Sequence, residues 1–254
     1  LNLATRLPDA LWYEPDAQAH DQRCWPRILD ALTAGTLLLF DLGYTNFTIF
    51  AQLTEAHVTF VTRAKSNLAY SVAHWLQQTG TVHEAVVWIG SGADRQQVRL
   101  IEVCYRNTWC RYLTNELDPQ TLPVLYAVAL YWQRWRIEDA FNAVKRLLGL
   151  AYFWTGSENG VAVQLWATWL LYAVLLDLTD AVAARLDQPL AALSLEMVYR
   201  SLYHFTAAFQ RGVATDVVEY LAANAKRLGI LMRKRATTPS HFVQLHALTL
   251  AAGP

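Results

Sequence analysis

The chain has 254 residues, of which 54% are hydrophobic and 17% are charged, and its formal net charge is zero. It can bury one substantial core, either in a single domain with an insertion or in two domains. Zero net charge excludes a globally basic surface, so any contact with nucleic acid must come from local patches. Three cysteines without a CxxC or Cys/His cluster predict neither disulfides nor a zinc site, and a reducing compartment fits best.

The first 65 residues are predicted to alternate between strands and helices. Apolar periodicity and turn residues separate the two kinds of element. In chain order we expect strands over 1–6 and 10–13 joined by a turn at Pro8-Asp9, a helix over 16–32, a strand over 36–40, a short helix over 47–53 and a strand over 58–62.

The next segment, residues 66–123, has the pattern of strands. Strands are expected over 86–89, 98–105 and 109–113, with turns at 90–94 and 106–107. After Pro123 the pattern is helical almost to the end of the chain. The sequence therefore predicts a mixed α/β protein.

An almost wholly apolar run over residues 161–176 allows two interpretations. It is broken only by Gln164 and is followed by Asp177 and Asp180. The run is shorter than the roughly 20 residues that span a bilayer, and a helix that is apolar all round is also typical of a protein core. We therefore expect a buried core helix and no membrane contact.

The most informative segment is predicted to be a helix over residues 131–145. At about 100° per residue, one face would carry a phenol, a guanidinium, a carboxylate and an ammonium group within about 40° of one another. This combination suits a divalent metal held beside a phosphate, although a solvated face with i, i+4 ion pairs is the simpler alternative. The polar face consists of Tyr131, Arg134, Glu138 and Lys145. The opposite, core-facing stripe consists of Ile137, Phe141, Val144 and Leu148.

These residues carry a resemblance to a known family. The spacing Tyr-x2-Arg-x3-Glu-x6-Lys resembles the signature of DDE transposases of the insertion-sequence-four group. Two further matches lie upstream, and together the matches cover roughly residues 1–165. They are Asp41 after an apolar strand and before Gly43-Tyr44, with Arg63-x-Lys65-x-Asn67 after the next strand, and the softer match His20-Asp21-Gln22.

The resemblance implies a ribonuclease-H-like (retroviral-integrase-like) mixed sheet with helices. We expect one catalytic domain over 1–254, with a β-rich insertion over 66–123 before the Glu-bearing helix and a helical part over 124–254. The family's first strand, with its aspartate, is expected before Leu1, so the domain would be truncated at its N-terminus. Asp9 and Asp16 lie in turn-like contexts and are not expected to replace that aspartate.

The implied chemistry is phosphoryl transfer with Mg²⁺, for which Mn²⁺ can substitute. Asp41 and Glu138 would be the catalytic metal ligands, and their carboxylates should then lie within about 4 to 8 Å of each other. Without the resemblance, Asp41 could equally be a turn former beside Gly43. Because one carboxylate is missing, the isolated chain is expected to be inactive.

The implied partners are double-stranded DNA at transposon ends and at the target, and a second copy in a synaptic homodimer in the bacterial cytoplasm, at the nucleoid. Candidate DNA contacts also have simpler alternatives: a solvated strand end, a core tryptophan or a charged tail. They are Tyr131, Arg134, Lys145, Arg63, Lys65, Trp109, and the basic runs Lys226-Arg227 and Arg233-Lys234-Arg235.

Two functions therefore remain open from the sequence. The first is a transposase fragment that cleaves and transfers strands at the ends of an insertion sequence. The second is a non-catalytic transposase remnant that at most binds DNA.

Overall fold

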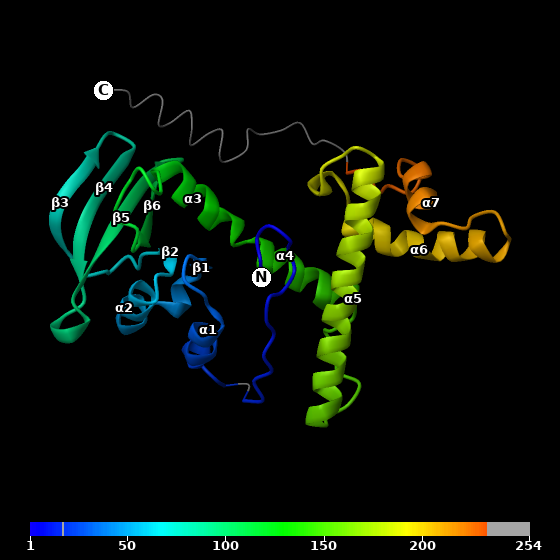
Figure 1. The fold of residues 1–254 in the computed structure, drawn as a ribbon, viewed down its shortest axis with the longest axis horizontal. Helices are drawn as coiled ribbons and strands as arrows, with labels where there is room; N and C mark the ends of the chain where they lie inside the picture. Colours follow the sequence, from blue (N-terminus) through cyan, green and yellow to red (C-terminus); the bar gives the residue numbers. More distant parts are fainter. Residues whose placement is uncertain (17, 233–254) are drawn as a thin grey trace. The chain divides into compact units, whose positions relative to one another are not determined.

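The computed structural model describes residues 1–16 and 18–232, and the described chain forms two compact units (Figure 1). The sheet unit is Asp16–Trp135. The helical unit combines Leu1–Pro15 with the described residues 136–232.

The sheet unit contains one six-stranded mixed sheet in the order β1-β2-β6-β5-β4-β3 (Figure 1). Only β1 and β2 run parallel, and every other neighbouring pair is antiparallel. The predicted mixed α/β class is confirmed. The strands are β1 (Leu37–Phe40), β2 (Thr59–Arg63), β3 (Ser71–Gln78), β4 (Val82–Ile89), β5 (Gln96–Tyr105) and β6 (Thr108–Thr114).

The strands of the β-rich segment extend the same sheet. β6 pairs directly with β2, with Val61 opposite Thr114. The sequence missed β3, which is an edge strand interrupted by two register shifts against β4. Such bulges break the period-two pattern on which a strand prediction depends.

One face of the sheet is covered by α1 (Trp25–Ala31) and α2 (Phe47–Glu55). Trp25, Phe50 and Phe60 are buried there. The helix predicted from residue 16 begins later, after a 3-10 turn over Asp21–Cys24, because Pro26 suits the first turn of α1, where its missing N–H leaves no bond unmade.

The other face is covered by α3 (Val124–Gln133). Val61, Ile101 and Tyr112 of the sheet pack with residues of this helix. Beneath the start of α3, the fully buried Arg99 lies 3.5 Å from Glu84 and donates a hydrogen bond to the Leu122 carbonyl. Burial lowers the pKa of Arg99 and raises the pKa of Glu84, so desolvation outweighs their mutual attraction.

The helical unit is built around α5, which packs against the following helices and against the N-terminal segment. Its two clusters of buried side chains are centred on Val182 and Leu221 and on Val144 and Trp169. The elements of the helical unit are α4 (Arg136–Asn142), a π-helical turn (Ala143–Leu147), α5 (Glu158–Arg185), a 3-10 turn (Leu190–Ala192), α6 (Leu195–Gln210) and α7 (Val217–Ala223). The sheet unit contains two further 3-10 turns, Leu42–Tyr44 and Gly92–Asp94.

Within the described ranges, α5 is the one helix that is long and apolar enough to cross a bilayer. Of its most apolar stretch of 18 residues, 33% is buried inside the protein. Trp169, Tyr172, Leu176 and Val182 lie in the two clusters of the helical unit. One side of α5 is therefore packed in the core of the helical unit, and its other side leaves apolar residues such as Trp166 and Leu170 exposed.

The two strands predicted over 1–6 and 10–13 are wrong, because this segment forms turns. The Asn2 side chain accepts hydrogen bonds from the amides of Ala4 and Thr5, and Arg6 has a positive φ of 60°. Leu1, Leu7 and Leu11 pack against the helical unit. Apolar residues that fit a short strand therefore serve here as separate anchors of a turning segment.

Candidate active site

Asp41 follows directly on the last residue of β1, at the edge where the parallel strands β1 and β2 both end. Its neighbour Phe40 is paired with Thr62, whose hydroxyl donates a hydrogen bond to the Phe40 carbonyl (3.0 Å). The Asp41 side chain is exposed, and its Oδ1 accepts a hydrogen bond from the Leu42 amide (2.7 Å). The sheet thus fixes the backbone while the carboxylate faces solvent.

The turn after Asp41 is held from α1 and the segment before it. Gln22 donates hydrogen bonds from Nε2 to the carbonyls of Gly43 and Thr45, and Trp25 Nε1 donates to the Tyr44 carbonyl. Gln22 belongs to the His-Asp-Gln stretch singled out in the sequence. Its role here is to fix the position of the strand-end turn.

Three other predicted residues lie around Asp41. Arg134 Nη1 lies 3.8 Å from Asp41 Oδ2, and its guanidinium carbon lies 5.9 Å from the centre of the Tyr131 ring. Burial and the charge of Asp41 raise the pKa of Tyr131, while Arg134 and Arg63 act in the opposite direction. Asp41, Arg63, Tyr131 and Arg134 are therefore one cluster at the sheet edge.

Tyr131 was expected to be exposed, and this is wrong. Only 4% of its surface is exposed, and its ring packs against Tyr112 at 5.3 Å between centroids. Trp132, the next residue, donates a hydrogen bond from Nε1 to the Tyr112 hydroxyl (3.2 Å). Packing against the sheet therefore places Tyr131 behind Arg134, where it can support the guanidinium.

The single helical face predicted over 131–145 is interrupted twice. The amides of Arg134 and Trp135 bond to carbonyls three residues back, so the α-helical repeat tightens where α3 ends. A π-helical turn then widens the repeat after α4. The spacing of 100° per residue is lost at both places, and π-turns of this kind are frequent at functional sites.

The remaining predicted residues of this segment belong to the helical unit. Glu138 lies in the first turn of α4 and is half-buried. Lys145 is exposed in the π-turn, with its Nζ 5.4 Å from the centre of the Phe141 ring. Of the predicted core stripe, Val144 is fully buried, but Phe141 is exposed and Ala140 is buried in its place.

Lys65 lies beyond the end of β2, exposed, and lines a cavity of about 500 Å³ together with Asn67. Ser91 and Asp94 of the β4–β5 hairpin also line this cavity. Thr48 of α2 donates a hydrogen bond to Asp94 (3.0 Å), which ties the hairpin to α2. Sequence reasoning missed the hairpin residues because only the fold brings them to Lys65.

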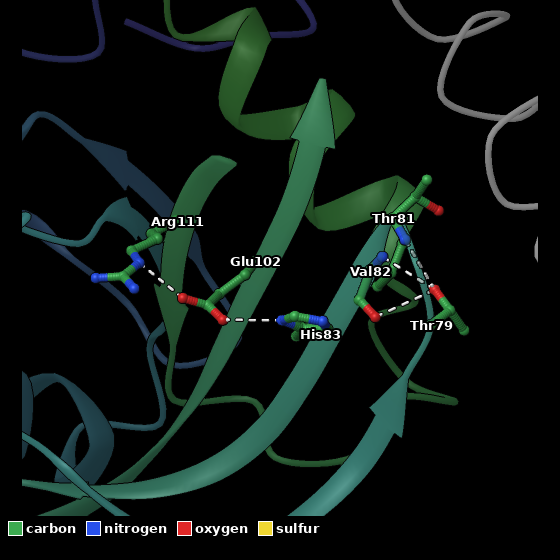
Figure 2. A network of polar contacts seen from close by, with 6 residues as sticks. All are labelled: Thr79, Thr81, Val82, His83, Glu102 and Arg111. Carbon is green, nitrogen blue, oxygen red and sulfur yellow. Dashed lines mark hydrogen bonds and ion pairs between the residues drawn. The ribbon is translucent and has the colours of Figure 1, made fainter. Parts of the chain in front are cut away.

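Trp109 is 41% exposed on β6 and stacks on His83 of β4, with 4.5 Å between ring centroids. Figure 2 shows that His83, Glu102 and Arg111 form a row across three strands. Glu102 lies 3.5 Å from His83 Nδ1 and 2.7 Å from Arg111 Nε. This row could not be predicted from the sequence, because it depends on strand register.

The other predicted groups are placed as follows. Lys226 and Arg227 are exposed after α7, whereas Arg233-Lys234-Arg235 lies outside the described residues. Asp16 forms an ion pair with Arg23 (2.7 Å).

The carboxylates predicted as metal ligands are of a type that suits a hard divalent cation. Carboxylate oxygens such as those of Asp41 and Glu138 are the ligands that Mg²⁺ and Mn²⁺ prefer. Among residues 1–16 and 18–232, no three His, Cys, Asp or Glu side chains form a group that could hold a metal ion. Asp41 and Glu138 belong to different units, so their approach remains a prediction.

The mixed sheet places the chain in the α/β class, and its strand-end carboxylate, Asp41, lies beside the Arg134 guanidinium. Residues 2–174 match the model of the family described as Transposase DDE domain, so the chain belongs to this family. Members of this family act on DNA and generally use divalent metal ions.

Two relatives are also named as transposases. The chain is similar to the transposase-named protein y4zB of Sinorhizobium fredii (strain NBRC 101917 / NGR234), with 27% identity over 199 residues, or 69% of this chain. It is also similar to the protein of Geobacillus stearothermophilus named for the transposase of insertion sequence element IS5377, with 23% identity over 206 residues, or 77% of this chain. The chain spans about half, 53%, of each relative.

Proposed function

We propose that this chain supplies part of the catalytic domain of a DNA transposase, which cleaves and transfers strands at the ends of an insertion sequence. The observation that carries the proposal is the exposed Asp41 carboxylate at the sheet edge, 3.8 Å from Arg134. A carboxylate fixed by the sheet and flanked by cations suits phosphoryl transfer, in which positioning and charge stabilisation do most of the work.

Asp41 and Glu138 would hold Mg²⁺, with Mn²⁺ as a substitute. When bound, such ions activate a water or a 3′-hydroxyl and stabilise the leaving oxygen. Arg134 would neutralise the phosphate that faces Asp41, and the buried Tyr131 ring would hold that guanidinium in place. In this role Tyr131 is a positioning residue and does not itself contact DNA.

The remaining basic residues would also bind DNA phosphates. Arg63 and Lys65 follow β2, and Lys145 is exposed in the π-turn. Trp109 would stack on an unpaired base near the transposon end, with His83 supporting its ring from behind.

The wider proposals concern architecture and setting. The sheet would be the ribonuclease-H-like core of one catalytic domain over 1–254, with 66–123 as its β-rich insertion and 124–254 as its helical part. The protein would act on double-stranded DNA as a homodimer in a synaptic complex. Its place would be the bacterial cytoplasm, at the nucleoid.

Lys145 gives a test of DNA binding. Replacing Lys145 by alanine should weaken binding to transposon-end duplex and lower the slope of log K against log salt by about 0.9, the value for one lost phosphate contact. The control is Arg200→Ala on α6, where Arg200 is paired with Glu196 (2.8 Å). Binding titrations at several salt concentrations measure the slope, and an unchanged slope would assign Lys145 a structural role.

A non-catalytic remnant is the second candidate function, favoured by the absence of a three-residue metal-ligand group in the described part of the chain. To separate the two functions, a protein that contains this chain and the family's first aspartate is incubated with Mg²⁺ or Mn²⁺ and DNA carrying the element's ends. A transposase that also carries the family's first aspartate should cleave this DNA, whereas a remnant should bind it without cleavage.

A further inference from the structure

Three consecutive aromatic residues stand exposed in the loop between the π-turn and α5. Tyr152 is 80% exposed, Phe153 52% and Trp154 87%. Aromatic side chains contribute large apolar areas and are usually buried. A contiguous exposed group of them marks an interaction site. We call residues 150–157 the aromatic loop.

The start of the aromatic loop is fixed by its own backbone. The Leu150 amide donates a hydrogen bond to the Val144 carbonyl, and the Ala151 amide to the Lys145 carbonyl, both at 3.2 Å. These bonds tie the loop to the π-turn. The aromatic residues therefore begin from a defined position beside Lys145.

The middle of the loop is held by Gln164, the polar residue that interrupts the apolar run of α5. The side chain of Gln164 is buried, with 6% of the residue exposed. Its Oε1 accepts a hydrogen bond from the Trp154 amide (3.0 Å), and its Nε2 donates one to the Tyr152 carbonyl (2.6 Å). A buried amide is costly unless it is satisfied, and this one bonds to the loop through both ends.

The end of the loop lies directly against the first turn of α5. A Cβ atom at Gly160 would come within 2.1 Å of Thr155 Cγ2, so the close approach needs glycine. Ser157 caps α5 by accepting a hydrogen bond from the Gly160 amide. The loop is thus anchored at its start, middle and end while its aromatic rings stay exposed, which lowers the ordering cost of binding.

The charges beside the loop indicate what it binds. Lys145 and Arg146 are exposed in the π-turn to which the loop is tied, whereas Glu158 is the exposed acid at the start of α5. Aromatic rings combined with cations are typical of surfaces that stack on unpaired bases and hold the adjoining phosphates. Paired bases are already stacked within the duplex, so the partner must present unpaired ones.

We propose that Tyr152, Phe153 and Trp154 form a preorganised stacking surface for unpaired DNA bases, with Lys145 and Arg146 on the neighbouring phosphates. The inference rests on the proposed function in one respect, namely that the ligand is DNA. It adds a second base-stacking surface, in the helical unit, to the one proposed at Trp109.

The test compares binding of Trp154→Ala to two fluorescent oligonucleotides, a blunt duplex and the same duplex with a short single-stranded overhang. Loss of one stacked base should weaken binding to the overhang DNA by about 5- to 100-fold. Affinity for the blunt duplex and the salt slope should stay unchanged, because no phosphate contact is lost. The matched control is Tyr203→Ala on α6, which removes a side chain that is 76% exposed.

A second variant tests the loop's anchoring. Gln164→Leu keeps the side-chain size and removes both hydrogen bonds to the loop, so overhang binding should fall although all three aromatic residues remain. Equal weakening on both DNAs, or a lowered melting temperature for Trp154→Ala, would overturn the inference. The inference would also be overturned if Trp154→Ala lost self-association or binding to lipid vesicles and kept its binding to DNA.

The outcome also separates this inference from the proposed function. If the unaltered chain binds both DNAs and Trp154→Ala binds them equally well, the stacking surface is refuted and the proposed function stands. If the unaltered chain binds neither DNA, the proposed function fails, and this inference fails with it.

Discussion

Replacing Asp41 by asparagine should reduce DNA strand cleavage at least ~10³-fold, because losing one metal-binding carboxylate removes several kcal/mol of transition-state stabilisation. Asparagine keeps a side-chain oxygen that can accept the Leu42 amide hydrogen bond, which now measures 2.7 Å. The strand-end turn should therefore survive. The measurement is the single-turnover rate of strand cleavage on labelled DNA carrying the element's ends, with a protein that also contains the family's first aspartate.

The control for this variant is Asp30→Asn, which neutralises an exposed aspartate on α1 in the same unit. It should cleave at the unaltered rate. DNA binding by Asp41→Asn should persist, because the substitution removes a negative charge that repels phosphate. A cleavage rate for Asp41→Asn within a few-fold of the unaltered protein would show that Asp41 is only a turn former.

Replacing Arg99 by leucine should lower the free energy of unfolding by about 3 to 5 kcal/mol, because Glu84 would remain buried without its partner. Arg99 is fully buried and Glu84 is 3% exposed. The variant also loses the hydrogen bond to the Leu122 carbonyl, which ties β5 to the start of α3. Urea unfolding should show a lower midpoint with an unchanged slope.

Two comparisons make this result specific. Arg111→Leu breaks a pair in which the arginine side chain is 36% exposed, and the 10% exposed Glu102 keeps His83 at 3.5 Å, so its cost should be clearly smaller than that of Arg99→Leu. The double variant Glu84→Leu with Arg99→Met removes both charges and should recover most of the loss. Equal costs for Arg99→Leu and Arg111→Leu would contradict the account.

The elements nearest the site were predictable where the signal is local. The apolar run before Asp41 has strand length and ends at a turn, so both β1 and the position of Asp41 followed from the sequence. The break at Arg134 was not predictable. It accompanies the packing of Tyr131 and Trp132 against Tyr112, a contact made across the fold.

The missed features share this dependence on tertiary contacts. In the sequence, Gln164 only interrupts an apolar helix. In the structure its side chain holds the loop ten and twelve residues earlier through two hydrogen bonds. His83, Glu102 and Arg111 align only through the register of three strands. The turns of the N-terminal segment depend on Asn2 and Arg6, whereas its leucines alone suggested a strand.

The central claim, that Asp41 and Glu138 serve one metal site, is tested most directly by a crystal structure of this chain grown with Mn²⁺. We expect an anomalous manganese peak with oxygens of both carboxylates as ligands, and the two carboxylates within about 4 to 8 Å of each other. Manganese bound by only one of the two, or the two carboxylates on opposite faces of the protein, would contradict it.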